Sequence, residues 1–324
     1  PVRLHWTTDF YSEMILNTNA PINIYEELIS KAKKYYDEVY LKLKKEDEKT
    51  KIFVYDAKDY YWTNFSSIIA RNPNTLYLPK KMKNDIFNDI EKFKNENQKQ
   101  LYNKLGIMYK RNYLFAGLPG AGKTTLVKCI AAKLKYNLSI INFGVSVDDA
   151  VFMKAVKTMQ KDSILLLEDI DCLFKERKSN DEHKNMITFS SLLNILDGIS
   201  SKPGLITIMT TNYKINLDTA LIRPGRIDMI LNFEHIKKSE IKEMFLKFMF
   251  INEIIKKDIK ITEQEIKDNY FKEFYTKMKS LNIEISPALL QQYLWKYVND
   301  PENAIKNVDE IKEIYKDVES DSKK

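Results

Sequence analysis

Long apolar runs are absent from this sequence. The longest stretch of this kind, "FLKFMFINEII" at residues 245–255, is interrupted by Lys247 and Glu253, whereas a membrane-spanning helix needs about 20 consecutive apolar residues. The first residues, "PVRLHWTT", have neither the charged front nor the apolar middle of a signal peptide. The sequence therefore predicts neither a membrane span nor export.

Cysteine and histidine are scarce. The two cysteines, Cys129 and Cys172, are too few and too far apart for a disulfide framework or a metal cluster, and we expect both to be reduced core residues. The three histidines, at positions 5, 183 and 235, share no ligand spacing. A metal centre built from these two residue types is not expected.

Arginine is also rare, with six residues in 324. The formal net charge of +7 comes almost entirely from lysines that alternate with glutamate and aspartate, which is typical of solvated helix faces rather than of a nucleic-acid-binding stripe. We therefore expect no nucleic-acid partner. Because arginine is so rare here, the presence of two arginines in one short turn suggests that they have a specific role.

Residues 1–100 are predicted to form a small mixed α/β domain. Apolar residues recur at helical spacing from Asn23 to Leu43, "IFVY" at 52–55 is typical of a short strand, and Pro79 opens a second helix. In that helix Ile86 and Ile90 share a face with Phe93. Nothing in this region points to chemistry.

Residues 101–236 alternate short apolar strands with helices, which predicts an α/β nucleotide-binding domain. Nearly continuous apolar strands indicate a parallel sheet that is covered on both faces. Five such strands are expected, namely "YLFAG", "LSIINF", "SILLLE", "LITIMTT" and "MILNF". Residues 237–324 contain only helical patterns, one of them opened by Ser286 and Pro287, and are predicted to form a helical domain.

Three of only eight glycines fall within "GLPGAGKT", which follows the first of these strands and leads into a helix. This is the context that a phosphate-binding loop requires, because bare backbone N–H groups must approach a triphosphate and a β-carbon would block them. Lys123 would contact the β and γ phosphates of ATP, and the Thr124 hydroxyl would bind Mg²⁺. The residues expected to bind the nucleotide are Gly117, Leu118, Pro119, Gly120, Ala121, Gly122, Lys123, Thr124 and Thr125.

Two adjacent carboxylates, Glu168 and Asp169, follow the buried strand "SILLLE". Open α/β sheets bind their ligands at the carboxyl ends of the strands, where such groups can hold Mg²⁺ and polarise an attacking water. An acidic pair after a strand is alone more often a helix cap, but its distance from the glycine loop favours a catalytic role.

Asn212 and two arginines complete the candidate site. Asn212 ends the strand "LITIMTT", where its amide can bond both the γ phosphate and the water; a simple turn residue is the alternative. Arg223 and Arg226 lie on either side of a Pro-Gly turn in "LIRPGRID", and two guanidinium groups aimed from one turn suit a transferring phosphoryl group. A surface salt bridge is the alternative for the arginines.

In order and spacing these motifs resemble the nucleotide-binding loop, acidic strand end, first sensor and arginine fingers of an AAA+ ATPase. More narrowly, "ILLLEDIDCLF", "ITFSSLLNILDGI" and "LIRPGRID" resemble the Bcs-one branch, the mitochondrial inner-membrane chaperones that translocate the folded Rieske iron–sulfur protein during respiratory complex III assembly. Residues 51–117 are similar to the domain and linker that precede the ATPase module of that family, and "ISPALLQQYLW" is similar to the start of a helix in its lid.

The resemblance implies a role for each motif. Glu168 takes the position near the metal where most AAA+ proteins carry aspartate, and Asp169 takes that of their catalytic glutamate, so which of the two polarises the water stays open. Asn212 would position that water. Arg223 and Arg226 would reach the ATP of a neighbouring subunit, which implies a homo-oligomeric ring.

The function implied is that of an ATP-hydrolysing chaperone or translocase that moves a folded protein client. Only about twenty residues separate "INF" from "ILLL", which leaves little room for a loop that threads extended chains. An AAA+ remodeller of nucleic acid and a low-turnover, nucleotide-dependent assembly scaffold stay open as alternatives. The family suggests the mitochondrial inner membrane as location, with membrane contact only through an N-terminal anchor for which this sequence shows no pattern.

Overall fold

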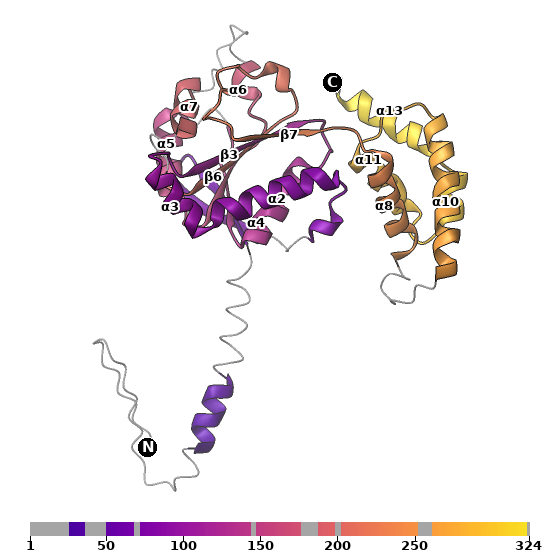
Figure 1. The fold of residues 1–324 in the computed structure, drawn as a ribbon, viewed down its shortest axis with the longest axis horizontal. Coiled ribbons are helices and arrows are strands. Elements are labelled where there is room, and N and C mark those ends of the chain that lie inside the picture. The colour runs from indigo at the N-terminus through magenta and orange to yellow at the C-terminus, as the bar shows by residue number, and fades with distance from the viewer. Residues whose placement is uncertain are drawn as a thin grey trace. The chain divides into compact units, whose positions relative to one another are not determined.

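The computed structural model describes residues 26–35, 50–67, 72–143, 147–175, 187–197, 202–251 and 261–322 (Figure 1). The chain divides into two compact units, Pro1–Lys49 and Thr50–Lys324. In the first unit residues 26–35 are helical, in agreement with the described part of the helix predicted from Asn23 to Leu43. The rest of that prediction lies outside the described residues.

The second unit is built on one seven-stranded sheet with the strand order β2-β1-β4-β5-β6-β3-β7. All neighbouring strands run parallel except β1 and β2, which pair as an antiparallel hairpin at one edge. The strands are β1 (Lys51–Asp56), β2 (Tyr61–Ser67), β3 (Lys110–Gly117), β4 (Asn137–Ile140), β5 (Ser163–Leu167), β6 (Leu205–Thr211) and β7 (Met229–Phe233).

The sequence predicted five strands in this sheet, and that number was too low by two. The five expected strands are β3 to β7, and the predicted strand at 52–55 is β1, which pairs in parallel with β4 through Phe53 and Ser139. The sheet thus crosses the domain boundary predicted at residue 100. Strand pairing between distant segments depends on tertiary packing, so the local pattern at 52–55 could not reveal its partner.

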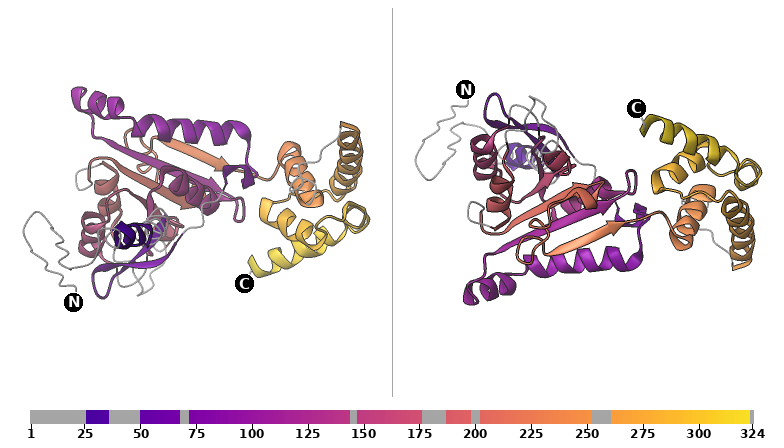
Figure 2. Two further views of the ribbon diagram at one scale, coloured as in Figure 1. Left: turned by 90° about the horizontal axis from the view of Figure 1, so that it is seen from below. Right: turned by 90° about the horizontal axis from the view of Figure 1, so that it is seen from above.

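Helices cover both faces of the sheet (Figures 1 and 2), and the alternation of side chains along each strand separates two cores. Tyr113 and Phe115 in β3 face one core, while Leu114 and Ala116 face the other. The first core is closed by α2 (Lys80–Lys94) and α4 (Lys123–Leu134), and the second by α5 (Asp149–Thr158) and α7 (Phe189–Asp197). The helices α3 (Glu96–Lys104) and α6 (Cys172–Lys175) and the 3-10 turns η1 (Pro73–Thr75) and η3 (Lys214–Asn216) complete this part.

A helical region with a core of its own follows β7. Its predicted helix begins as expected, because the Ser286 side chain accepts a hydrogen bond from the Leu289 amide and Pro287 occupies the first turn. The helices are α8 (Lys238–Met249), α10 (Ile261–Ser280), α11 (Pro287–Lys296), α12 (Pro301–Lys306) and α13 (Glu310–Ser322). Across the described ranges, no helix combines the length and the apolar character that crossing a membrane requires.

Candidate nucleotide-binding and catalytic site

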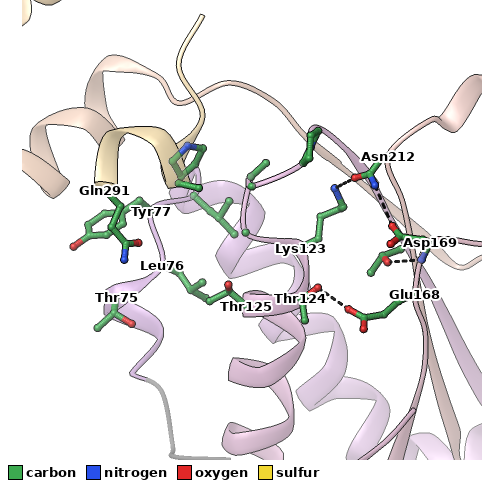
Figure 3. A pocket seen from close by; sticks show the side chains of 18 residues that line it. Thr75, Leu76, Tyr77, Lys123, Thr124, Thr125, Glu168, Asp169, Asn212 and Gln291 are labelled. Carbon is green, nitrogen blue, oxygen red and sulfur yellow. Dashed lines mark hydrogen bonds between the residues drawn. The ribbon is translucent and has the colours of Figure 1, made fainter. Parts of the chain in front are cut away.

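A cavity of about 400 Å³ lies at the carboxyl ends of β3, β5 and β6 (Figure 3). These three strands are neighbours in the sheet, so residues that are far apart in the sequence meet at one edge. The lining residues are Thr75 to Leu78, Pro119 to Thr125, Glu168, Asp169, Thr210, Asn212, Pro287, Ala288 and Gln291.

The glycines of the loop after β3 are required by its backbone. Gly117, Gly120 and Gly122 have φ angles of 141°, 70° and 97°, which residues with a β-carbon adopt only with strain. A β-carbon on Gly117 would lie 2.0 Å from the carbonyl oxygen of Phe233 in the adjacent strand β7. Gly122 is the N-cap of α4 and provides no capping side chain, so the N–H groups of the first helical turn are left to a ligand.

Lys123 is buried at the first position of α4. Its ammonium donates to the carbonyl oxygens of Gly117 at 2.7 Å and Leu118 at 2.9 Å, and to Oδ1 of Asn212 at 2.7 Å. Burial lowers the pKa of Lys123, while the nearby carboxylates of Asp169 and Asp171 act in the opposite direction. The loop thus holds one ammonium group at the N-terminus of α4, where the helix dipole also favours anions.

The two adjacent carboxylates have different partners. The Thr124 hydroxyl donates to Oε1 of Glu168 at 2.7 Å, whereas Nδ2 of Asn212 donates to Oδ1 of Asp169 at 3.1 Å. Glu168 therefore lies beside the Thr124 hydroxyl, which is expected to bind Mg²⁺. Asp169 belongs to a chain of hydrogen bonds that runs through Asn212 to Lys123 (Figure 3).

The turn after β5 is held against the end of β6. Asp169 has a φ of 48°, and its amide donates to the Thr210 hydroxyl at 3.1 Å. Two residues further along the chain, Oδ1 of the buried Asp171 accepts a hydrogen bond from the Thr211 hydroxyl at 2.9 Å. Sequence reasoning missed Thr210 and Asp171; the third acidic residue of "EDID" was the available signal for Asp171.

A second side of the cavity comes from segments that the sequence did not connect with the site. Leu76 and Tyr77 approach from the segment before α2, and Gln291 approaches from α11 (Figure 3). Ala288 of α11 lines the cavity as well. The Ala288 amide donates to the carbonyl oxygen of Gly120 at 3.2 Å, so the helical region touches the phosphate loop directly. The stretch "ISPALLQQYLW" predicted the helix that carries Ala288 and Gln291, but not its contact with the phosphate loop, which depends on tertiary packing.

Gly117, Leu118 and the two arginines do not line the cavity. The carbonyls of Gly117 and Leu118 instead hold the Lys123 ammonium. Arg226 forms a two-pronged ion pair with Asp197, with Nε–Oδ1 at 2.9 Å and Nη2–Oδ2 at 3.0 Å, and Arg223 is exposed. The salt-bridge alternative is therefore present for Arg226 within its own chain.

The arginine-bearing turn lies beside the opposite end of β3 from the phosphate loop. The Asp228 amide donates to the Asn112 carbonyl at 2.9 Å, and Asn112 precedes Gly117 by five strand residues, about 16 Å at the usual rise. The turn that carries Arg223 and Arg226 therefore lies far from the phosphate loop of its own chain.

The side chains present fit a nucleoside triphosphate with Mg²⁺. The loop lines the cavity through Gly120 and Gly122, whose positive φ angles and missing β-carbons leave the backbone N–H groups accessible. One ammonium faces the loop, and a hydroxyl with a carboxylate offers the oxygen ligands that Mg²⁺ prefers. Lys123 and the amides of residues 120–124 would hold the phosphates, while Thr124 and Glu168 would hold the metal.

A mostly parallel sheet with a glycine loop after β3, and with paired acidic residues directly after β5 two strands away, defines a phosphate-loop nucleotide-binding protein. The model of the ATPase family associated with various cellular activities (AAA) matches residues 113–235. The model of the Mitochondrial chaperone BCS1-like ATPase lid domain matches residues 238–310. The chain therefore belongs to the AAA ATPases of the BCS1 type.

Curated relatives support this assignment. The chain is 31% identical to the Probable mitochondrial chaperone BCS1-B of Dictyostelium discoideum over 319 residues, which cover 89% of this chain and 64% of the relative. It is 30% identical to the Mitochondrial chaperone BCS1 of Homo sapiens over 275 residues, covering 82% of this chain and 62% of the relative. Protein HYPER-SENSITIVITY-RELATED 4 of Arabidopsis thaliana is 32% identical over 232 residues, which cover 65% of this chain and 40% of the relative. The chain thus spans about two thirds or less of the length of these relatives.

Proposed function

We propose that the protein is an ATP-hydrolysing chaperone or translocase of the BCS1 type, which works as a homo-oligomeric ring on a folded protein client. The observation that supports the ATPase activity is that the two adjacent carboxylates have different hydrogen-bond partners. Glu168 bonds to Thr124, and Asp169 bonds to Asn212. Two acidic groups with different partners can serve different roles, one beside the metal and one beside the water.

In this proposal each side chain has one task. Lys123 neutralises the terminal phosphates, and its bond to Asn212 keeps that amide beside the γ phosphate. Asp169 accepts a hydrogen bond from Asn212 and has a second carboxylate oxygen with which to orient and polarise the water. Mg²⁺, held by Thr124 and Glu168, would neutralise charge on the transferred group.

The arginine turn supports action between subunits. Arg223 and Arg226 do not line the cavity of their own chain and lie near the far end of β3. A guanidinium supplied by a neighbouring subunit would stabilise the charge that develops on the phosphoryl group. The cavity would then be complete only in a ring.

The coupling of hydrolysis to movement is proposed to pass through the contact between the loop and the lid. Ala288 at the start of α11 bonds to Gly120 in the phosphate loop, so a change at the phosphates shifts the lid's anchoring point. The names of the relatives in Dictyostelium and Homo sapiens describe mitochondrial chaperones. A protein client and a location at the mitochondrial inner membrane are proposed here by that similarity.

Phosphate release from ATP with Mg²⁺, measured together with sedimentation velocity, tests the proposal. We expect turnover that rises with protein concentration as rings form. A chain that stays monomeric and gives no calorimetric response to ATP with Mg²⁺ would refute it. Binding without turnover would support the assembly scaffold instead, and stimulation by DNA or RNA with a steep salt dependence would support the nucleic-acid remodeller.

A further inference from the structure

Two polar side chains are buried near the start of β3, in a strand that is otherwise largely apolar. Lys110 is 8% exposed and Asn112 is 1% exposed. Burying an ammonium or an amide costs free energy unless its donors find acceptors. Their partners therefore indicate what these two residues are for.

The acceptors of both side chains are main-chain carbonyls of the same two segments. The Lys110 ammonium donates to the carbonyl of Gly225 at 2.8 Å and to that of Leu196. Nδ2 of Asn112 donates to the carbonyl of Arg226 at 2.7 Å and to that of Leu196 at 3.1 Å. One segment is the arginine turn, which we define as residues 221–228, and the other is the end of α7.

Further bonds close the same network. The main-chain N–H of Asn112 donates to Oδ2 of Asp228 at 2.7 Å, and the main-chain N–H of Asp228 donates to the main-chain carbonyl of Asn112 at 2.9 Å. Asp197, directly after Leu196, binds the guanidinium of Arg226. The arginine turn is thus fixed to β3 through its backbone and the Asp228 carboxylate, and to α7 through the Arg226 guanidinium.

We propose that Lys110 and Asn112 are positioning residues for the arginines, which set the direction of the arginine turn by holding the carbonyls of Gly225 and Arg226. The inference rests on the proposed function, in which Arg223 and Arg226 act on the nucleotide of the next subunit. In this arrangement β3 carries the phosphate loop of its own subunit at Gly117, and its other end supports the arginines that act on the neighbouring subunit.

The geometry separates this role from direct catalysis. Neither Lys110 nor Asn112 lines the nucleotide cavity, so their loss leaves the binding residues of the same subunit in place. Both arginine side chains also stay chemically intact. What changes is the support of the backbone between them, and small displacements of a catalytic group can reduce a rate by about a hundredfold.

The first test compares Lys110→Met and Asn112→Ala with the unaltered protein. For each variant we expect kcat for ATP hydrolysis to fall about tenfold or more, with the Kd for ATP and Mg²⁺ changed less than about twofold. Tyr109→Phe is the matched control, because it removes a 2.8 Å bond to the Phe93 carbonyl, which lies outside the arginine turn. This control should keep its kcat.

A mixing experiment tests the positioning role itself. Lys123→Ala subunits keep their arginines but lose their own nucleotide site, and Lys110→Met subunits have the opposite defect. Lys123→Ala alone should be inactive and Lys110→Met alone should keep at most about a tenth of the normal kcat, whereas mixed rings should exceed the activity of both, because an intact site in one subunit meets well-placed arginines from the other. Mixtures of Lys110→Met with Arg223→Ala, both defective as donors, should show no such gain.

The outcomes separate the inference from the proposed function. A normal kcat in both variants, or no recovery of activity on mixing with Lys123→Ala, overturns the positioning role. The proposed function stands in that case if the unaltered protein hydrolyses ATP and Arg223→Ala does not. Full activity of Arg223→Ala together with Arg226→Ala refutes action between subunits, and the inference with it. Circular dichroism melting identifies a variant that does not fold, in which case Asn112→Ala, which keeps the buried charge, decides the result.

Discussion

The hydroxyl of Thr124 lies 2.7 Å from Oε1 of Glu168, although 43 residues separate the two in the chain. The next residue, Asp169, turns to Asn212 instead. This division assigns neighbouring carboxylates to different ends of the same phosphate site, and it can be tested one residue at a time.

Exchanging the two carboxylates for amides should give different defects. Asp169→Asn keeps the metal side and should bind ATP normally while its turnover falls about a hundredfold or more, because the water loses its polarising group. Glu168→Gln should raise the Mg²⁺ concentration needed for half-maximal turnover. A Mg²⁺ titration of phosphate release in both variants provides the measurement. Normal hydrolysis by Asp169→Asn and none by Glu168→Gln would exchange the two roles.

Lys123→Ala should abolish nucleotide binding. The ammonium is the cation of the loop, and its removal takes away the charge that would neutralise the phosphates and leaves the carbonyls of Gly117 and Leu118 without this donor. Isothermal titration with ATP and Mg²⁺ should show no heat of binding. Lys128→Ala, on the exposed face of the same helix, is the control and should bind as before; equal binding by both variants would contradict the assignment of the loop.

Gly117→Ala should destabilise the protein, and Gly106→Ala should do so much less. Both glycines have positive φ angles, but only the Gly117 β-carbon would meet another strand, 2.0 Å from the Phe233 oxygen, while at Gly106 nothing lies within 4 Å. We expect a loss of about 3 kcal/mol or more for Gly117→Ala and about 1 kcal/mol for Gly106→Ala in urea unfolding. Similar losses for both would show that the contact with β7 has no energetic importance.

The ion pair between Asp197 and Arg226 should contribute stability that acid removes. The hydrogen bonds from Arg226 hold the pKa of Asp197 below its ordinary value of 3.8. A depressed pKa means that the contribution is complete above the unfolded-state value and is lost as the pH falls through the folded-state value. Because Asp197 is one-third exposed, we expect only about 1 kcal/mol.

Urea unfolding of the unaltered protein and of Asp197→Asn at pH 7 and at about pH 2.5 measures this contribution. The difference between the two proteins should be largest at pH 7 and should shrink in acid, and Arg226→Met should remove it at both pH values. A difference independent of pH would mean that the carboxylate charge is not responsible.

Much of the fold followed from local patterns. The five apolar strands after residue 106, the helix from Ser286 and the shared face of Ile86 and Ile90 all appear in the structure, because alternation and capping are set by residues close in sequence. The strand predicted at 52–55 was placed in the separate domain of residues 1–100, and only its pairing with β4 shows that it and its hairpin partner β2 extend the central sheet.

The sequence by itself determined the glycine loop, its lysine, the acidic pair and the asparagine, since each has a recognisable spacing from a strand end. The structure brings Lys123, Thr124, Glu168, Asp169 and Asn212 into one hydrogen-bonded group, while their catalytic roles stay predictions. The wall from Tyr77 and Gln291, and the support of the arginine turn by Lys110 and Asn112, were decided only by the tertiary structure. The physical reason is that a carbonyl acceptor or an apolar wall carries no sequence signature; which donor reaches it depends on how distant segments pack.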